Sequence, residues 1–312
     1  MNRYTVKLST IVTEHGLRAL NLSSDYESKY LEVADVNRPA LQLAGFYNYF
    51  DPRRLQIIGR VETNYLGSLG REERLAAFRA LFEKGIAGLI ICHGCSPFPE
   101  CLEAAEALDT CVFITGENTS TIEAGLLASL HRHMAPRITV HGVLVEIYGE
   151  GVLITGESGM GKSETALELI KRGHRLIADD AVEIKYLGPK ELLGTAPDVI
   201  RYYMELRGIG VINVKQLYGV GAVKPDTLLD LVVDLQPWQE GYAYDRLGLT
   251  SDSQNILGVT LPKVTIPVRP GRNLAVILEL AAMNNRQKKM GYNAAEALAA
   301  EVDAIANGDY NG

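Results

Sequence analysis

The sequence has no apolar run that approaches the ~18–20 residues that a membrane-spanning helix needs. Its first residues, "MNRYTVKLSTIVTEHGL", alternate between polar and apolar side chains and lack the hydrophobic core of a signal peptide. Positive charge is not in excess, because 31 lysines and arginines face 38 acidic residues and give a net charge of −7. This balance argues against a surface for nucleic acid or for an anionic membrane. We therefore expect a cytoplasmic protein without nucleic-acid or membrane partners.

Cysteine is also scarce, and its spacing gives weak support for a metal site. The four cysteines are Cys92, Cys95, Cys101 and Cys111. Cys92 and Cys95 form a C-x-x-C around His93, a spacing found in zinc and redox sites. However, Cys92 ends the apolar run "AGLIIC", which is typical of a buried strand, and no second closely spaced pair follows. We expect buried thiols in a reducing compartment.

The chain of 312 residues is long enough for two ordinary domains. In the first part, residues 55–62 and 87–94 read as strands and residues 71–85 as an amphipathic helix. Residues 111–134 read as strand, turn and helix, with Thr or Ser of "GENTST" expected as the helix cap in preference to an anion site. This alternation predicts an α/β domain over residues 1–131, whose role the sequence does not reveal.

A second domain is expected over residues 132–312, because the pattern changes near Pro136. Residues 143–155 read as a hairpin, residues 163–173 as a helix and residues 174–188 as a strand pair or one long strand. Two helical segments end the chain, and we find no internal repeat. The fold class is therefore α/β throughout.

The stretch "GESGMGKSE" at residues 156–164 has the spacing of a phosphate-binding loop. The expected nucleotide-binding residues, which we call the phosphate loop, are Gly156, Glu157, Ser158, Gly159, Met160, Gly161, Lys162 and Ser163. Backbone N–H groups and the following helix N-terminus would hold phosphate oxygens. Lys162 would reach the β- and γ-phosphates and Ser163 would bind Mg²⁺. The alternative is a glycine-rich turn with a surface lysine, but a strand precedes the loop and a helix follows it.

Asp179 and Asp180 end the apolar run "HRLIA", where an acidic residue can hold Mg²⁺ directly or through water. Adjacent residues of a strand point to opposite faces, so one carboxylate can serve the metal and the other can accept a proton. The alternative is a solvated turn. His141 lies just before the strand that leads into the phosphate loop, and a lone histidine there is otherwise a structural or surface residue.

Several segments, in this order, resemble HPr kinase/phosphorylase. They are "GESGMGKSE", "RLIADD", "MELRGIGVINV", "YGVGAV" and "PVRPGRN". The resemblance implies an enzyme that uses ATP or pyrophosphate with Mg²⁺ to phosphorylate a serine of the phosphocarrier protein HPr. It also implies phosphorolysis, in which inorganic phosphate removes that group and pyrophosphate leaves. The implied fold of the second domain is a P-loop kinase similar to the nucleotide-binding core of phosphoenolpyruvate carboxykinase, with C-terminal helices.

The same resemblance implies roles for individual residues. The catalytic residues are His141, Lys162, Asp180 and Arg246; the metal ligands are Ser163 and Glu205, with Asp179 a weaker candidate. Residues 204–213 would serve both activities. Phosphorolysis would need the cationic loop, made of Pro267, Val268, Arg269, Pro270, Gly271 and Arg272, whose two arginines suit phosphate capture. A homohexamer, regulation by fructose 1,6-bisphosphate and control of sugar uptake through carbon catabolite repression are implied as well.

Two other functions remain open from the residues themselves. One is phosphoryl transfer to a small metabolite, as in phosphoenolpyruvate carboxykinase, although no second metal site is evident. The other is a nucleotide switch without turnover, against which Asp180 and the cationic loop argue. Near the end of the first C-terminal helix, Arg286, Lys288 and Lys289 are expected either to grip the protein substrate or to form a solvated helix end.

Overall fold

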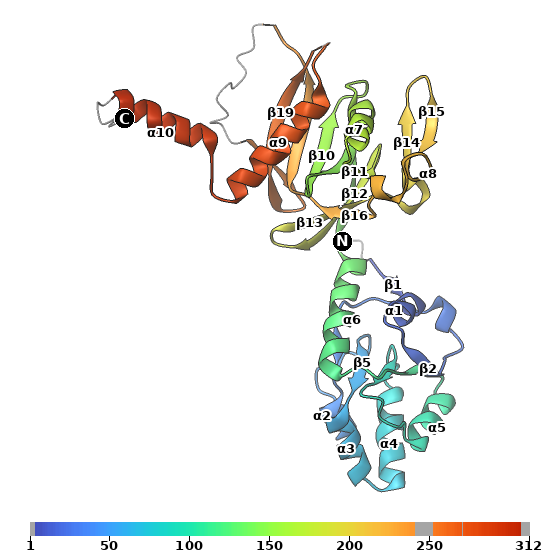
Figure 1. Ribbon diagram of the computed structural model, residues 1–312. Helices are drawn as coiled ribbons and strands as arrows, with labels where there is room; N and C mark the ends of the chain where they lie inside the picture. The colour runs from blue at the N-terminus through green and yellow to red at the C-terminus, as the bar shows by residue number, and fades with distance from the viewer. Residues whose placement is uncertain (1–3, 241–251, 270, 307–312) are drawn as a thin grey trace. The chain divides into compact units, whose positions relative to one another are not determined.

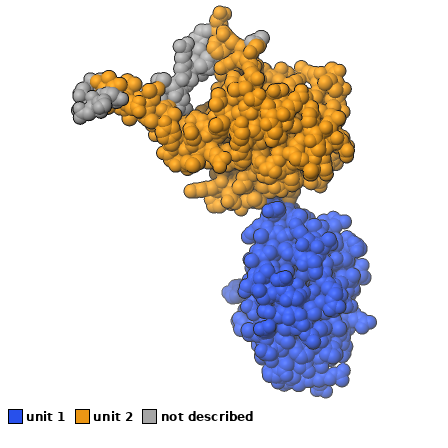
Figure 2. All heavy atoms as spheres, in the orientation of Figure 1, with its two compact units in different colours: residues 1–135 blue, residues 136–312 orange. Residues whose placement is uncertain are grey.

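The structure, a computed structural model, describes residues 4–240, 252–269 and 271–306. The chain folds into two compact units, residues 1–135 and residues 136–312, which are described separately (Figure 2). No helix within the described residues is long and apolar enough to cross a membrane.

The first unit is built on a five-stranded sheet in the order β2-β7-β6-β5-β4. Strands β4 to β7 are parallel and β2 is antiparallel to β7. The strands are β1 (Val6–Lys7), β2 (Arg18–Asn21), β3 (Tyr30–Leu31), β4 (Val36–Asn37), β5 (Leu55–Ile58), β6 (Leu89–Ile91) and β7 (Val112–Ile114). The helices are α1 (Leu8–Glu14), η1 (Tyr26–Ser28), α2 (Ala40–Leu43), α3 (Arg60–Ser68), α4 (Arg71–Phe82), α5 (Pro99–Ala107) and α6 (Thr119–Met134).

Helices cover both faces of this sheet, which explains why its central strands are apolar at every position but one. On one face, Ile57 and Phe113 pack with α1 and α6. On the other, Ile58 and Val112 pack with α2, α3, α4 and α5. Figure 1 shows this layering. The α/β alternation expected from the sequence is confirmed.

The cap of α6 differs from the expected Thr or Ser. Asn118 is the N-cap residue, and its side chain accepts a hydrogen bond from the Thr121 N–H at 2.8 Å. Thr119 is instead the first helical residue and is buried. Asn accepts a hydrogen bond from a free N–H of the first helical turn as well as Ser or Thr does. The residue types in "NTST" therefore did not show which one is the N-cap.

The cysteine thiols are free, and three of the four are buried. Burial raises the pKa of the Cys92 thiol to about 11 and that of Cys101 to about 12. A thiol with such a pKa stays protonated at neutral pH and is a poor nucleophile and metal ligand. The expectation of buried thiols is confirmed for Cys92, Cys101 and Cys111, whereas Cys95 is half-buried.

The second unit contains a six-stranded sheet in the order β11-β9-β10-β17-β19-β18. Its strands are β9 (Val143–Ile147), β10 (Glu150–Gly156), β11 (Arg175–Ala178), β17 (Leu231–Pro237), β18 (Asp252–Ile256) and β19 (Val259–Val268). Strands β10, β17 and β19 run parallel, and β9 and β18 are antiparallel to their neighbours. The expected hairpin is confirmed: Tyr148 and Gly149, with φ of 51° and 89°, join β9 to β10.

A smaller antiparallel sheet in the order β16-β13-β12-β8 packs on one face of the large sheet. It consists of β8 (Arg137–His141), β12 (Ala181–Gly188), β13 (Glu191–Thr195) and β16 (Asp226–Leu228). Leu144 and Leu153 of the large sheet meet Val182 and Ile184 of the small one. Because β11 and β12 belong to different sheets, the expected strand pair over residues 174–188 is two strands that separate at Asp179 and Asp180.

The opposite face of the large sheet is covered by helices α7 (Lys162–Lys171) and α9 (Leu274–Lys289). Val145 and Val152 of the sheet pack with Leu169 of α7 and Leu278 of α9. The hairpin β14 (Tyr203–Leu206) and β15 (Gly210–Asn213) lies beside α7 (Figure 1). The remaining elements are η2 (Asp198–Ile200), α8 (Val214–Tyr218), η3 (Val220–Ala222) and α10 (Ala294–Ala306). The expected C-terminal helices are therefore α9 and α10.

Candidate active site

The phosphate loop connects the end of β10 to the start of α7, as the sequence predicts for a phosphate-binding loop. Gly156 has φ of 135°, and a Cβ on it would lie 2.4 Å from the carbonyl oxygen of Leu235 in β17. Gly159 and Gly161 have φ of 89° and 81°. Only glycine readily adopts the φ of Gly156. The loop therefore depends on its glycines for its backbone conformation and for the close approach of β10 to β17.

Lys162 lies inside this loop. Its side chain is only 7% exposed, and Nζ donates hydrogen bonds to the carbonyl oxygens of Gly156 at 2.9 Å and Glu157 at 3.1 Å. An ammonium carries three donors, so Lys162 can also donate to a phosphate oxygen held by the loop. Together with the N-terminus of α7, it provides the positive charge that a triphosphate or pyrophosphate requires.

Ser163, the last residue of the phosphate loop, contacts Asp179. Ser163 Oγ donates to Asp179 Oδ1 at 2.8 Å, and the Glu205 N–H donates to Asp179 Oδ2 at 3.1 Å. Burial raises the pKa of the Asp179 carboxyl above its ordinary value, and the charge of Asp180 adds to this effect. The hydrogen bonds from Ser163 and Glu205 act in the opposite direction. Asp179 is thus a carboxylate whose negative charge a bound cation would stabilise.

These oxygen atoms fit Mg²⁺, which prefers hard oxygen ligands. No cluster of three or more His, Cys, Asp or Glu side chains that could hold a metal ion occurs among the described residues. Mg²⁺ is ordinarily held by one or two carboxylates together with substrate phosphates, so the hydroxyl of Ser163 and the carboxylate of Asp179 are a sufficient protein contribution. The structure brings Glu205 to this point through its backbone amide, while its side chain is exposed.

Asp180 does not continue the strand, contrary to the expectation that both carboxylates lie on one. It has φ of 67°, and the Ala181 N–H donates to the Asp179 carbonyl oxygen at 2.8 Å, which closes a three-residue turn. The turn directs the Asp180 side chain to the surface, where it is 70% exposed. The carboxylates do point apart, but the cause is a left-handed residue and not the alternation of a strand.

His141 contacts Asp180. Its Nδ1 lies 3.1 Å from Asp180 Oδ1, and both side chains are largely exposed. The contact is fixed by the backbone, because His141 pairs with Ala181 in the β8–β12 register and the Gly142 N–H donates to the Asp180 carbonyl oxygen at 3.1 Å. The structure therefore brings Lys162, Ser163, Asp179, Asp180 and His141 together around the phosphate loop.

The β14–β15 hairpin adds a residue that sequence reasoning did not single out. Arg207 Nη2 donates to Ser158 Oγ of the phosphate loop at 3.0 Å. Its guanidinium also lies close to Gly159, 3.2 Å from the position of an added Cβ. Arg207 is inside the 204–213 segment expected to serve both activities, and its place in that segment was the available signal.

The cationic loop begins at the sheet edge where the phosphate loop begins. Gly156 in β10 pairs with Leu235 in β17, and Leu235 pairs with Ile266 in β19. Since these three strands are parallel, their carboxyl ends meet at the same edge, the usual place for ligands in open α/β sheets. Arg272 Nη1 donates to the Pro267 carbonyl oxygen at 2.9 Å. Two expected site residues, Arg246 and Pro270, lie outside the described residues.

Two further groups at this edge were missed from the sequence. Trp238 lies under the guanidinium of Arg269, with Cζ 3.6 Å from the ring centroid. Asp234 accepts hydrogen bonds from Thr155 at 3.1 Å and contacts Lys263 at 3.1 Å. Both are positioned by pairing between strands distant in sequence, which leaves no local motif to recognise.

Lys289 is not free to grip a protein substrate, contrary to one of the two expectations for this helix end. Its ammonium donates to Glu150 at 2.7 Å and also forms an ion pair with Asp230. Lys289 thus fastens the end of α9 to the large sheet. Lys288, its neighbour, is exposed.

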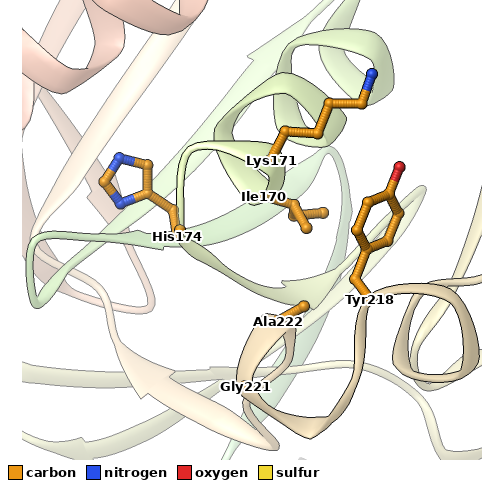
Figure 3. Close-up of a pocket in the computed structure, with 7 residues that line it drawn as sticks. Ile170, Lys171, His174, Tyr218, Gly221 and Ala222 are labelled. Atoms are coloured by element: carbon orange, nitrogen blue, oxygen red, sulfur yellow. The ribbon is translucent and has the colours of Figure 1, made fainter.

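A cavity of about 310 Å³ lies at the other end of α7 from the phosphate loop (Figure 3). Figure 3 shows Lys171 and Tyr218 on one side of this cavity and His174 on the other. His174 Nε2 lies 3.0 Å from a Glu279 carboxylate oxygen. Since α7 has ten residues and a helix rises about 1.5 Å per residue, the cavity is roughly 15 Å from the phosphate loop. It is not part of the phosphate site.

Comparison with known proteins gives a consistent result over most of the chain. Residues 6–130 match the family model for the HPr serine kinase N terminus, and residues 132–302 match that for the HPr serine kinase C-terminal domain. The HPr kinase/phosphorylase of Caldicellulosiruptor bescii is 51% identical, over 92% of this chain and 93% of the relative. That of Lachnoclostridium phytofermentans is 48% identical, over 95% of this chain and 96% of the relative. A solved structure of the Hpr(Ser) kinase/phosphatase from Coxiella burnetii is 36% identical, over 49% of this chain and 99% of that one, with a TM-score of 0.45.

Proposed function

The chain belongs to the HPr serine kinase family, and on this basis we propose that it phosphorylates a serine of the phosphocarrier protein HPr and removes that phosphate by phosphorolysis. The observation that carries the proposal is one arrangement. The buried Lys162 lies inside the phosphate loop, and the buried carboxylate of Asp179 contacts the last residue of that loop. The exposed carboxylate of Asp180 follows directly in the chain.

In the kinase direction, the phosphate loop and Lys162 would bind the phosphates of ATP or pyrophosphate and neutralise their charge. Ser163 and Asp179 would hold Mg²⁺ against the phosphate oxygens, and Glu205 is a further ligand on the strength of the family resemblance. The metal supplies charge neutralisation and in-line alignment when bound. Arg207, which donates a hydrogen bond to Ser158, would help to hold the phosphate loop in place.

Asp180 would accept the proton of the seryl hydroxyl as its oxygen bonds to phosphorus and the bond to the nucleotide's β-phosphate oxygen breaks. Because the Asp180 side chain is exposed, a serine on another protein can reach it. His141, which contacts Asp180, would orient the carboxylate. In phosphorolysis an oxygen of inorganic phosphate would form a bond to the phosphoserine phosphorus as the bond between that phosphorus and the seryl oxygen breaks. The seryl oxygen would take a proton from Asp180, and pyrophosphate would leave.

Inorganic phosphate needs a site of its own, and the cationic loop is its candidate. Arg269 and Arg272 follow β19 at the sheet edge shared with the phosphate loop. Guanidinium groups bind phosphate through paired N–H donors, which suits capture of a nucleophile that must approach in line. Arg246 is proposed as a catalytic arginine from the resemblance alone.

The finer features of the proposal also rest on the resemblance. They are a cytoplasmic homohexamer, a catalytic unit of residues 132–312 similar to the nucleotide-binding core of phosphoenolpyruvate carboxykinase, and regulation by fructose 1,6-bisphosphate. The role proposed in the cell is control of sugar uptake and carbon catabolite repression. Residues 1–131 receive no catalytic role.

The test is to incubate the full chain with Mg²⁺, ATP and purified HPr, and then with excess inorganic phosphate. We expect one serine of HPr to gain a phosphoryl group, and phosphate addition to remove it with an equal amount of pyrophosphate. Transfer to a small metabolite without transfer to HPr would favour the carboxykinase-like function. Nucleotide binding without any transfer would favour a switch.

A further inference from the structure

The only tryptophan of the chain, Trp238, lies directly after β17 and contacts the cationic loop. Arg269 Cζ is 3.6 Å from the centroid of the Trp238 ring, a short stacking distance for a guanidinium. The backbones are joined as well, because the Trp238 N–H donates to the Val268 carbonyl oxygen at 3.2 Å. Pro237 and Val268 are the last paired residues of β17 and β19. Val268, Arg269 and the ring therefore form one local unit.

Stacking engages the flat face of the Arg269 guanidinium and leaves its edges available. The five N–H donors of arginine lie in the plane of the group and point outward from its edges. An arginine held by its face is thus fixed in orientation while its paired donors can still bind phosphate oxygens. Arg272 is placed differently, since its Nη1 already donates to the Pro267 carbonyl oxygen within the loop.

We propose that Trp238 is a positioning residue for phosphorolysis, which holds Arg269 in the orientation that binds the attacking inorganic phosphate. The proposal rests on the proposed function, since it assigns a role within that reaction. It requires that phosphate binds at Arg269 and that the Trp238 ring improves this binding. ATP is held by the phosphate loop and Lys162, so the kinase reaction with ATP does not depend on this contact.

Removing the ring should therefore separate the two activities. We expect Trp238→Leu to raise the KM for inorganic phosphate in phosphorolysis by about three- to tenfold, the range expected when a cation–π contact is lost. The KM for ATP in the kinase reaction should stay within about twofold. Trp238→Phe, which keeps an aromatic face, should restore most of the phosphate affinity. A purely structural role for Trp238 would lower both activities together.

Two further variants test whether the effect passes through Arg269. If it does, Trp238→Leu should add little to the phosphate KM of Arg269→Ala, because the ring has no guanidinium left to hold. Lys215→Ala is the matched control, because it removes an exposed cation from a second cation–π pair, in which Lys215 Nζ lies 5.4 Å from the ring centroid of the half-buried Tyr202. Neither KM should change in that variant.

A binding measurement keeps the proposal separate from the proposed function. Trp238 is the sole tryptophan, so its fluorescence reports this site directly. Titration of the wild-type chain with inorganic phosphate should change the emission saturably, and the same titration of Arg269→Ala should not. An unchanged phosphate KM in Trp238→Leu, with a large increase in Arg269→Ala, would overturn the role of Trp238 and leave the function standing. A wild-type chain that removes no phosphate from HPr would overturn both.

Discussion

Replacing Gly156 by alanine tests whether the phosphate loop depends on close approach between two strands. Gly156 ends β10 with φ of 135°, and an added Cβ would lie 2.4 Å from the Leu235 carbonyl oxygen of β17. The obstacle is backbone in the middle of the large sheet, so a side-chain rotation cannot relieve it. The alanine must push β10 and β17 apart or distort the loop.

The expected cost follows from two separate effects. A left-handed backbone costs an ordinary residue about 1–2 kcal/mol, and forcing an extra carbon into a packed site costs about 1–3 kcal/mol. Gly156→Ala should thus lower the free energy of unfolding of the second unit by about 2–5 kcal/mol. Gly173→Ala is the matched control, because Gly173 has φ of 98° but nothing lies within 4 Å of its added Cβ. Gly173→Ala should lower the unfolding free energy only by the cost of the left-handed backbone, about 1–2 kcal/mol.

Urea unfolding followed by tryptophan fluorescence measures this difference in the intact chain. Trp238 is the only tryptophan and belongs to the second unit, so the signal reports that unit alone. Titration with ATP and Mg²⁺ should show binding to Gly173→Ala and weakened or absent binding to Gly156→Ala. Equal unfolding free energies for the two variants would refute the reasoning, because the β17 carbonyl would then impose no steric limit on the loop.

Three other changes give distinct outcomes. Lys162→Met should lower kcat about 10²–10³-fold in both directions, as measured by HPr phosphorylation and pyrophosphate release, since both lose the same phosphate charge neutralisation; loss in one direction only would contradict this. Glu279→Gln should cost about 1–2 kcal/mol in unfolding free energy at pH 7, because the half-exposed Arg172 and the buried His174 both hydrogen-bond the buried Glu279 carboxylate. The hydrogen bond from Arg172, and next that from His174, hold the pKa of Glu279 below its ordinary value. The stability that this carboxylate contributes is therefore full above about pH 4.3 and is lost as the pH falls through its pKa in the folded state. The unfolding free energies of the wild type and Glu279→Gln should then converge in acid. Lys289→Ala should lower the unfolding free energy by about 1–3 kcal/mol, because the buried Glu150 carboxylate loses its cation and keeps only the hydrogen bond from Asn285, whereas Lys288→Ala should not; equal stability of the two would count against the ion pair.

The sequence predicted several strands and helices of both units because hydrophobic periodicity depends on local residues, but it did not predict the second sheet that packs on the large one. Runs such as residues 143–155 identify strands and their turn, and the helices that follow cover the sheets. The phosphate loop was predictable for the same reason, since its glycines, Lys162 and Ser163 are contiguous. All the residues that this motif needs to bind phosphate lie in one short segment between a strand and a helix, so the sequence alone shows them.

Contacts between distant segments could not be predicted in this way. Trp238 meets Arg269, and Arg207 meets Ser158, only because of strand order and hairpin packing. The sequence also did not show that Lys289 is bound within the chain, because Glu150 and Asp230 are 139 and 59 residues away along the sequence. Pairing of this kind depends on the sheet order β11-β9-β10-β17-β19-β18, which no local pattern encodes.

The adjacent carboxylates Asp179 and Asp180 differ in a backbone feature that would divide the two chemical tasks proposed for them. If the strand continued, the two side chains would lie on opposite faces of the sheet. Asp180 instead has a left-handed backbone, and the chain turns at this residue. Asp179 stays buried against Ser163, where burial disfavours its charge and a cation would restore it. Asp180 reaches the surface beside His141, where the serine of another protein can approach. A non-glycine residue in a left-handed conformation persists only when its surroundings hold it, here through the backbone hydrogen bonds of Gly142 and Ala181.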